Sequence, residues 1–467
     1  MTKLRKLFKH APDSSENIYQ GLLGLYVAAI LVSKIAWTPS IAAYVVFIRA
    51  CMERIVLWGS ALFLFDYLLK WQKNISGING NSEELCRDGR TEGNEGIKDG
   101  IIPAVLGICL LAVTLVFNTI MTPNTYTLVM DIYFCIMAYK KNYRQILRLV
   151  LTLSSATLLI GVVGFVIGFT DDVFIFKPDR IGAVHSYGII HPNIWAEIFF
   201  MALMLFWYLY LEKRHILTII LFWISAFCVN TFLACKTITI LLLLFPVMSF
   251  IIFWFCKRET VYKSVDEEGL FLSITEDVNK KIDDECGDSN KSVRRKPGIR
   301  KIMLVNTPLL FFIITLVLCW QMDWIHDTFY STRFLSFAMR FVEGGYVIRE
   351  KGISLFGQSL VSFKSPEISY LQDITHVVDN AFVRYLITRG LLWMVLCLFW
   401  VTLANAKCLK NRDYRLLLIS IFMLLLAMMS RCALDMWFNY VLLYPFASVC
   451  NEMVNGSSFI TKRKNTA

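Results

Sequence analysis

Two arginines on one edge of a short predicted helix form the first group of residues that could carry chemistry. In "STRFLSFAMRFVEGG", residues 331–345, Arg333 and Arg340 border a stripe of phenylalanines when the segment is placed on a helix at about 100° per residue. Guanidinium groups bind phosphate oxygens bidentately and keep their charge. The pair therefore predicts a helix at the membrane surface that binds a phosphate group. The alternative is that both arginines only extend toward water or contact lipid phosphates.

A second group stands at the head of an apolar run in "THVVDNAFVRYLITRGLL", residues 375–392. His376, Asp379 and Asn380 precede the run, and Arg384 and Arg389 lie within it. Ionisable groups near the head of a membrane span usually face a cavity or pair with one another. The alternative is an ordinary helix cap, in which Asp379 or Asn380 accepts from backbone N–H groups.

A third group is the triplet His191-Pro192-Asn193, directly in front of another apolar run. Proline fits the first position of a helix, so free N–H groups and the positive end of the helix dipole should lie beside His191 and Asn193. This arrangement suits an anion. Arg180 and His185 lie upstream and could converge on it, although a lone histidine is more often structural.

Signatures of metal or nucleotide-sugar chemistry are absent from the sequence. It has no HExxH, GxSxG or Walker A motif, and Asp171-Asp172 and Asp283-Asp284 are adjacent pairs without the DxD spacing. The arginines, imidazoles and carboxylate therefore predict a site without metal or cofactor, and such a site fits a lipid-linked diphosphate.

The elements that must position these residues are membrane helices. The chain has 467 residues, 56% of them hydrophobic, and a mean hydropathy of +0.55, which is too apolar for a water-soluble domain of ordinary composition. A span needs about 20 apolar residues, so the sequence predicts a single all-α polytopic membrane domain over 1–467 with about twelve spans. The expected spans are 18–37, 52–70, 101–121, 123–139, 146–168, 193–211, 215–234, 237–256, 302–320, 385–404, 414–430 and 433–450.

The formal charge of +11 is explained by topology. Most Lys and Arg stand in short clusters between apolar runs, which predicts that both termini and the polar loops 71–100 and 257–301 are cytoplasmic, and argues against a nucleic-acid partner. Segments 169–192 and 321–384 then face outward, and the second should contain short helices and most of the active site. The 13 cysteines are scattered without a CxxC pair, so neither disulfides nor a thiolate metal site is expected.

Three stretches together resemble one family. "GIIHPNIWA", "LSFAMRFVEGGYVIREKGISLFGQ" and "VVDNAFVRYLITRGLL" resemble, in this order, motifs of Wzy-type repeat-unit polymerases of O-antigen and capsule synthesis. The likeness covers roughly the second half of the chain. Ala196 stands where the family often has glycine, and Cys235-Lys236-Thr237 stands where it has Ser-Arg-Thr, which keeps a positive charge but loses a bidentate donor.

The resemblance implies a GT-C-like glycosyltransferase at the outer face of the bacterial cytoplasmic (inner) membrane. It would transfer a growing glycan from undecaprenyl diphosphate to a lipid-linked repeat unit, in O-antigen, capsule or exopolysaccharide synthesis. Stabilising the diphosphate is assigned to Arg180, Arg333, Arg340 and Arg384, and the base to His376 or Asp379, with His191 next. Supporting roles fall to Pro192, Asn193, Asn380 and Lys236.

Two other functions remain open at this stage. A ligase of the same superfamily would pass the glycan to another acceptor, and a flippase for lipid-linked oligosaccharides would only move it across the membrane. The expected partners are membrane lipid, the undecaprenyl diphosphate-linked oligosaccharide, and the flippase and chain-length regulator of the same pathway. Glu197, one turn inside its span, has no assigned role.

Overall fold

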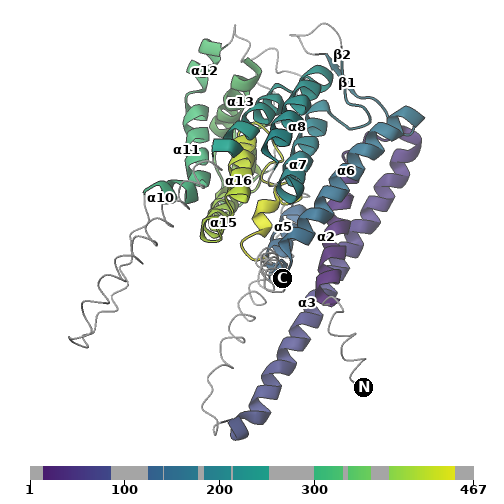
Figure 1. Cartoon of the computed structure of the whole chain (residues 1–467), viewed down its shortest axis with the longest axis vertical. Helices are drawn as coiled ribbons and strands as arrows, with labels where there is room; N and C mark the ends of the chain where they lie inside the picture. Colours follow the sequence, from purple (N-terminus) through teal and green to yellow (C-terminus); the bar gives the residue numbers. More distant parts are fainter. Residues whose placement is uncertain are drawn as a thin grey trace, which may run out of the picture.

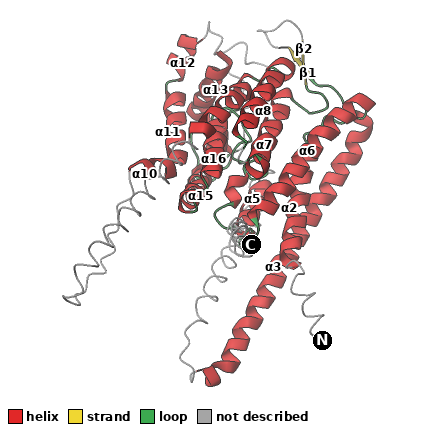
Figure 2. Ribbon diagram, in the orientation of Figure 1, coloured by secondary structure: helices red, strands yellow, loops and turns green. Residues whose placement is uncertain are grey.

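Residues 14–85, 125–139, 141–176, 183–211, 214–251, 299–329, 335–358 and 378–447 are described by a computed structural model of the chain. The regular secondary structure of this part is helical except for one antiparallel hairpin, strands β1 (Phe174–Phe176) and β2 (Ala183–His185), which lies at one end of the bundle (Figures 1 and 2). The first helices are α2 (Ser14–Val32), α3 (Pro39–Leu85), α5 (Thr125–Met137), α6 (Tyr143–Ile167), α7 (Pro192–Tyr210) and α8 (His215–Cys228), which continues as the π-helix η2 (Val229–Leu233). After the helix Lys236–Ile251 come α10 (Ile299–Val305), α11 (Thr307–Trp320), α12 (Met322–Phe329), α13 (Leu335–Lys351), α14 (Ala381–Thr388), α15 (Gly390–Lys410), α16 (Tyr414–Ala427) and the 3-10 helix η4 (Tyr440–Leu443).

The protein is a helical membrane protein. Within the described residues, four helices are long and apolar enough to cross a bilayer: Tyr143–Ile167, Pro192–Tyr210, His215–Leu233 and Gly390–Lys410. Helices α11 and α12 would add a fifth crossing if the 74° bend between them lies inside one span. Large apolar side chains cover the outside of the bundle, for example Val166 and Ile216, which are 75% and 76% exposed. Such a surface fits lipid rather than water.

The helix boundaries agree with several expected spans and depart from others. Helix α7 begins at Pro192, as its sequence indicated, but α3 runs on to Leu85, through the first half of the expected polar loop 71–100. The expected span 385–404 is divided between α14 and α15 at Gly390, whose φ of 87° is left-handed and whose Cβ would lie 2.4 Å from the Gly357 nitrogen. The expected span 101–121 and most of the expected loop 257–301 lie outside the described residues.

The last expected span, 433–450, is wrong over its described residues. Helix α16 ends at Ala427, and residues 428–447 form turns and the short η4 while lying buried in the bundle. Hydropathy predicted a span because the segment is apolar, yet it is apolar as core and contains Asp435, Asn439 and Pro445. Non-helical backbone at membrane depth is tolerated where protein buries it and supplies hydrogen-bond partners.

Those partners are side-chain donors that occupy backbone carbonyls along this segment. Asn439 donates to Ala433 (3.1 Å), Tyr143 to Tyr440 (3.1 Å), Trp400 to Leu442 (2.8 Å), and Lys407 to Tyr444 (2.9 Å), Pro445 (3.1 Å) and Ala447 (2.6 Å). An unsatisfied buried carbonyl would cost roughly 1–3 kcal/mol. The segment is therefore held in one conformation by elements distant in sequence, and it carries residues of the site described below.

The hairpin end of the bundle is tied to the turn between α2 and α3. Ala36 donates its N–H to the Gly188 carbonyl (2.9 Å), and Ile190 donates to the Lys34 carbonyl (2.9 Å). Gly188 has a φ of 85°, and a Cβ there would lie 2.0 Å from the Gly161 carbonyl oxygen, so only glycine fits. These bonds fix the chain immediately before His191 and the start of α7.

Candidate functional site

Arg340 is the centre of the candidate site. It lies on α13, and its Nη1 donates to the hydroxyl of Thr237, at 2.9 Å. Thr237 is in the first turn of the helix Lys236–Ile251, just after Ala234, whose left-handed φ of 48° turns the chain out of η2. The contact brings the arginine stretch of segment 321–384 onto the Cys235-Lys236-Thr237 stretch.

Glu343 and Asp379 share the surroundings of Arg340. Glu343 is one turn farther along α13, and Asp379 directly precedes Asn380, the cap of α14, a helix that packs on α13. Burial raises the pKa of Glu343 to about 7, the negative charge of Asp379 adds to the shift, and Arg340 opposes it. A carboxyl with this pKa exchanges its proton near neutral pH, which suits acid–base chemistry.

Glu197 reaches the same place from α7. Its carboxylate forms a hydrogen bond with Ser430 and lies within electrostatic range of Asp379, Arg340 and Arg431. Ser430 and Arg431 belong to the buried non-helical segment 428–447. A glutamate that the sequence left without a role is thus part of the charged cluster, because a carboxylate inside a membrane bundle needs polar partners.

Arg384 has a backbone partner. Its Nη1 lies 3.4 Å from the Arg431 carbonyl oxygen, so α14 is linked to the segment that carries Ser430 and Arg431. Cys432 lies within electrostatic range of Arg384, Glu197 and Lys34, so charged groups from α14, from α7 and from the turn after α2 approach the same segment.

His191 and Asn380 cap the helices that enter the site. The Nδ1 atom of His191 accepts the N–H of Asn193 at 3.0 Å, and Oδ1 of Asn380 accepts the N–H of Val383 at 3.2 Å. The helix-cap interpretation of Asn380 is therefore confirmed. With its Nδ1 lone pair occupied, a neutral His191 carries its proton on Nε2 and is a donor there. Within the described residues, Asn193 Oδ1 and Asn380 Nδ2 are buried without a hydrogen-bond partner.

A second charged network surrounds Arg389. Its guanidinium is 3.2 Å from Asp435 and 3.6 Å from Asp131, and it stacks on the Tyr385 ring with 4.3 Å to the centroid. Tyr385 donates to Asp435, and Tyr26 donates to Asp131 at 2.8 Å. All these side chains are nearly inaccessible. The network joins α2, α5, α14 and segment 428–447, and a buried ion pair with this many hydrogen bonds holds them in register.

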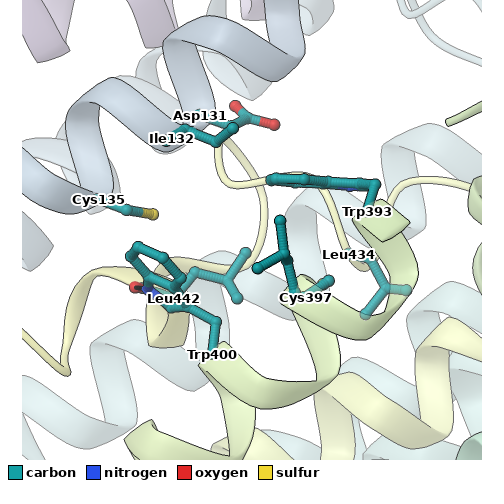
Figure 3. Close-up of a pocket in the computed structure, with 9 residues that line it drawn as sticks. Asp131, Ile132, Cys135, Trp393, Cys397, Trp400, Leu434 and Leu442 are labelled. Carbon is teal, nitrogen blue, oxygen red and sulfur yellow. Dashed lines mark hydrogen bonds between the residues drawn. The ribbon is translucent and has the colours of Figure 1, made fainter. Parts of the chain in front are cut away.

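An apolar pocket opens beside Asp131, between α5 and α15. Asp131, Cys135, Trp393, Cys397 and Trp400 are among the residues that line it (Figure 3). The lining is apolar apart from the Asp131 carboxylate, so this pocket is chemically distinct from the charged cluster around Arg340.

The residues expected at the site have different outcomes. Arg340 and Asp379 both lie near Glu343, and Lys236 directly precedes Thr237, the partner of Arg340. Pro192 and Asn193 are the first residues of α7, and His191 and Asn380 are helix caps. Three expected residues, Arg180, Arg333 and His376, lie outside the described residues. His185 contacts Asp172 on the β-hairpin.

Sequence reasoning missed Glu343, Ser430 and Arg431 as members of the cluster, and Asp131 and Asp435 as partners of Arg389. The available signal for Asp131 and Asp435 was an isolated acid within an apolar run, a pattern that marks functional or paired groups in membranes. The sequence contains no comparable signal for Ser430. Its contact with Glu197 depends on the turns of segment 428–447.

Comparison with known proteins leaves the site to be interpreted from its own geometry. No family model, no curated protein and no solved structure matches this chain.

Proposed function

We propose that the protein is a Wzy-type polysaccharide polymerase of GT-C-like architecture at the outer face of the bacterial cytoplasmic membrane. It transfers a growing glycan from undecaprenyl diphosphate to the terminal sugar of a lipid-linked repeat unit. The observation that carries the proposal is the contact of Arg340 with Thr237 inside a group of carboxylates, Glu197, Glu343 and Asp379. The resemblance of the three sequence stretches supports the same assignment.

The reaction needs two things that this cluster offers. The bond between the anomeric carbon and the diphosphate oxygen breaks, so negative charge grows on the leaving diphosphate, while the acceptor hydroxyl forms the new glycosidic bond and loses a proton. Arg340 and Arg431, with the N-terminal end of α7, stabilise the departing diphosphate. Arg333, Arg180 and Arg384 remain proposed contributors from the sequence.

A carboxylate takes the proton of the acceptor hydroxyl. We assign this role to Asp379, with Glu343 as the neighbouring carboxyl group; His376 remains the alternative. Carboxylates close to a diphosphate would repel it if all were ionised. A Glu343 pKa of about 7 relieves this conflict, because the group is partly protonated at neutral pH. His191, a donor at Nε2 when neutral, suits a phosphate oxygen better than it suits a base.

The topology follows from the same assignment. Helix α7, which carries Glu197, begins at the hairpin end of the bundle (Figure 1), and Arg340 lies in the first half of α13. The basic pair Lys213-Arg214 follows the other end of α7, so the positive-inside rule puts the start of α7 outside, where lipid-linked repeat units are polymerised. The flippase and the chain-length regulator of the pathway are the proposed partners.

The test uses purified protein in lipid nanodiscs, incubated with the lipid-linked repeat unit alone, without nucleotide sugar or added metal. We expect a ladder of products that differ by one repeat unit, with release of undecaprenyl diphosphate. A single transfer to a different acceptor would instead identify a ligase. Movement of the substrate across a bilayer without any longer glycan would identify a transporter and contradict the proposal.

A further inference from the structure

The β-hairpin at the end of the bundle carries an oriented carboxylate–imidazole pair. One carboxylate oxygen of Asp172 makes a short hydrogen bond with Nδ1 of His185, and the other accepts the N–H groups of Ser186 at 2.9 Å and Tyr187 at 3.1 Å. Burial opposes ionisation of Asp172, but these hydrogen bonds hold its pKa below the usual range. Both carboxylate oxygens of Asp172 therefore have hydrogen-bond partners. Asp172 fixes the His185 ring through Nδ1, which leaves Nε2 on the side of the ring away from this bond.

Aromatic rings flank the imidazole. Phe174 is the cross-strand partner of His185, so both side chains stand on the same face of the hairpin, with ring centroids 6.5 Å apart. The Tyr187 ring centroid lies 6.0 Å from that of the imidazole. Phe174 is 57% exposed and the His185 side chain 47% exposed, so an imidazole and a neighbouring aromatic ring are open to a ligand.

The backbone beneath these rings is strained and fixed. Tyr187 has a left-handed φ of 48°, a conformation that costs a non-glycine residue roughly 1 kcal/mol or more and that clusters at functional sites. The Asp172 carboxylate holds the Tyr187 N–H in this conformation, and the adjacent Gly188 is bonded to Ala36. A surface fixed in this way loses little conformational entropy when it binds a ligand.

The side chains on the described part of the hairpin indicate the kind of ligand. Within its described residues, 169–176 and 183–190, the carboxylates are Asp171 and Asp172, and the basic group is the His185 imidazole, which is paired with Asp172. These described residues include no lysine or arginine, the side chains that usually bind phosphate in proteins. Aromatic faces beside a polar donor or acceptor suit a neutral sugar, whose ring has apolar C–H faces and a polar rim.

We propose that Phe174, Tyr187 and His185 form a sugar-binding subsite for the glycan substrate, with Asp172 as its positioning residue. The inference rests on the proposed function, because the Arg340 cluster is proposed to bind the diphosphate and the hairpin would bind the sugars attached to it. Strand β2 packs on η2, and η2 leads within a few residues to Lys236 and Thr237 beside Arg340. A glycan whose diphosphate lies at Arg340 can thus extend its sugars toward the hairpin.

The experiment measures sugar binding apart from polymerisation. The probe is the repeat-unit oligosaccharide released from its lipid carrier by mild acid, titrated against the full-length protein in nanodiscs. We expect Phe174→Ala and His185→Ala each to weaken binding by roughly tenfold, about 1.4 kcal/mol. Asp171→Asn is the matched control: it changes the neighbouring exposed acid and should stay within about twofold. Unchanged binding by both variants, with unchanged melting temperatures, would overturn the subsite.

Two further outcomes separate this inference from its alternatives. A Phe174→Trp variant should show fluorescence that changes with the oligosaccharide; quenching by brominated lipids that the oligosaccharide does not relieve would show a membrane contact and overturn the subsite. If the wild type makes no polymer but binds the probe in a Phe174-dependent way, the polymerase assignment fails and the subsite stands. If it makes polymer and both variants bind the probe normally, the subsite fails and the polymerase assignment stands.

Discussion

The guanidinium of Arg389 lies 3.2 Å from the carboxylate of Asp435, and both side chains are nearly inaccessible. Arg389 stands at the junction of α14 and α15, whereas Asp435 belongs to the non-helical segment 428–447. The pair therefore fixes a stretch of irregular backbone to the helix that also carries Arg384. Because Ser430 and Arg431 are on that stretch, the pair also helps to position these two residues at the candidate site.

Replacing Asp435 with Asn should destabilise the protein strongly. The change leaves Arg389 with Asp131 as its remaining carboxylate partner, and breaking a buried ion pair costs about 3–5 kcal/mol. Denaturant unfolding in detergent would measure the loss. The matched control is Asp323→Asn, which removes the exposed partner of Arg349 and should cost less than about 1 kcal/mol. An equal loss of unfolding free energy in the two variants would show that Asp435 does not stabilise segment 428–447 through Arg389.

Replacing Glu343 with Gln should change how stability depends on pH. The pKa of Glu343 is raised from 4.5 to about 7 in the folded protein, so the folded state binds more protons than the unfolded state between these values. Stability from this group is complete below pH 4.5 and is lost as the pH rises through about 7. At pH 8 the Gln variant should be more stable than the wild type, by an upper limit of about 3 kcal/mol at 1.36 kcal/mol per pKa unit.

The pH series needs a control for other acids on α13. Glu350→Gln changes an exposed acid of the same helix and should leave the pH dependence as in the wild type. Parallel stability curves for the wild type and Glu343→Gln from pH 4 to pH 8 would show that Glu343 does not hold a proton in the folded state.

Two substitutions at His191 distinguish its role as the N-cap of α7 from its proposed role as a donor to the diphosphate. Asparagine is a good N-cap, so His191→Asn should keep the stability of α7, whereas His191→Ala should lose about 1 kcal/mol. Both lack the Nε2 donor, and both should slow polymerisation if it contacts the diphosphate. Polymer formation at the wild-type rate in the Asn variant would reduce His191 to a helix cap.

A double-mutant cycle tests the link between Glu197 and Ser430. If their hydrogen bond positions segment 428–447 at the site, Glu197→Gln and Ser430→Ala should be non-additive in polymerisation rate, with a coupling of roughly 0.5–3 kcal/mol. Additive effects would show that the two side chains act independently.

The sequence allowed the membrane class and the local helix starts to be predicted, because these depend on neighbouring residues. Pro192 at the head of α7 and Asn380 as a cap are examples. Segment 433–447 was mispredicted because hydropathy measures how apolar a stretch is, and a buried turn-rich segment is as apolar as a span. Its carbonyl partners, such as Trp400 and Lys407, are contacts between distant elements that no local pattern records.

The candidate site shows the same division. Arg340 and Asp379 were predicted from their own short stretches, whereas Glu343 and Arg431 were not. Glu343 is recognisable only through its distance from Asp379, and Arg431 only through the turn that brings it to Glu197. The positions of Glu343 and Arg431 in the cluster depend on the tertiary packing of α7, α13 and α14.

The most direct test of the account replaces Arg340 with Lys in the nanodisc polymerisation assay. Lysine keeps the charge but loses the bidentate geometry and the reach to Thr237, so the rate of chain extension should fall at least about a hundredfold, or roughly 2.7 kcal/mol in transition-state stabilisation. Arg349→Lys, on the exposed side of the same helix, should extend chains at nearly the wild-type rate. Wild-type chain length and rate in the folded Arg340→Lys protein would contradict the assignment of this site to polymerisation.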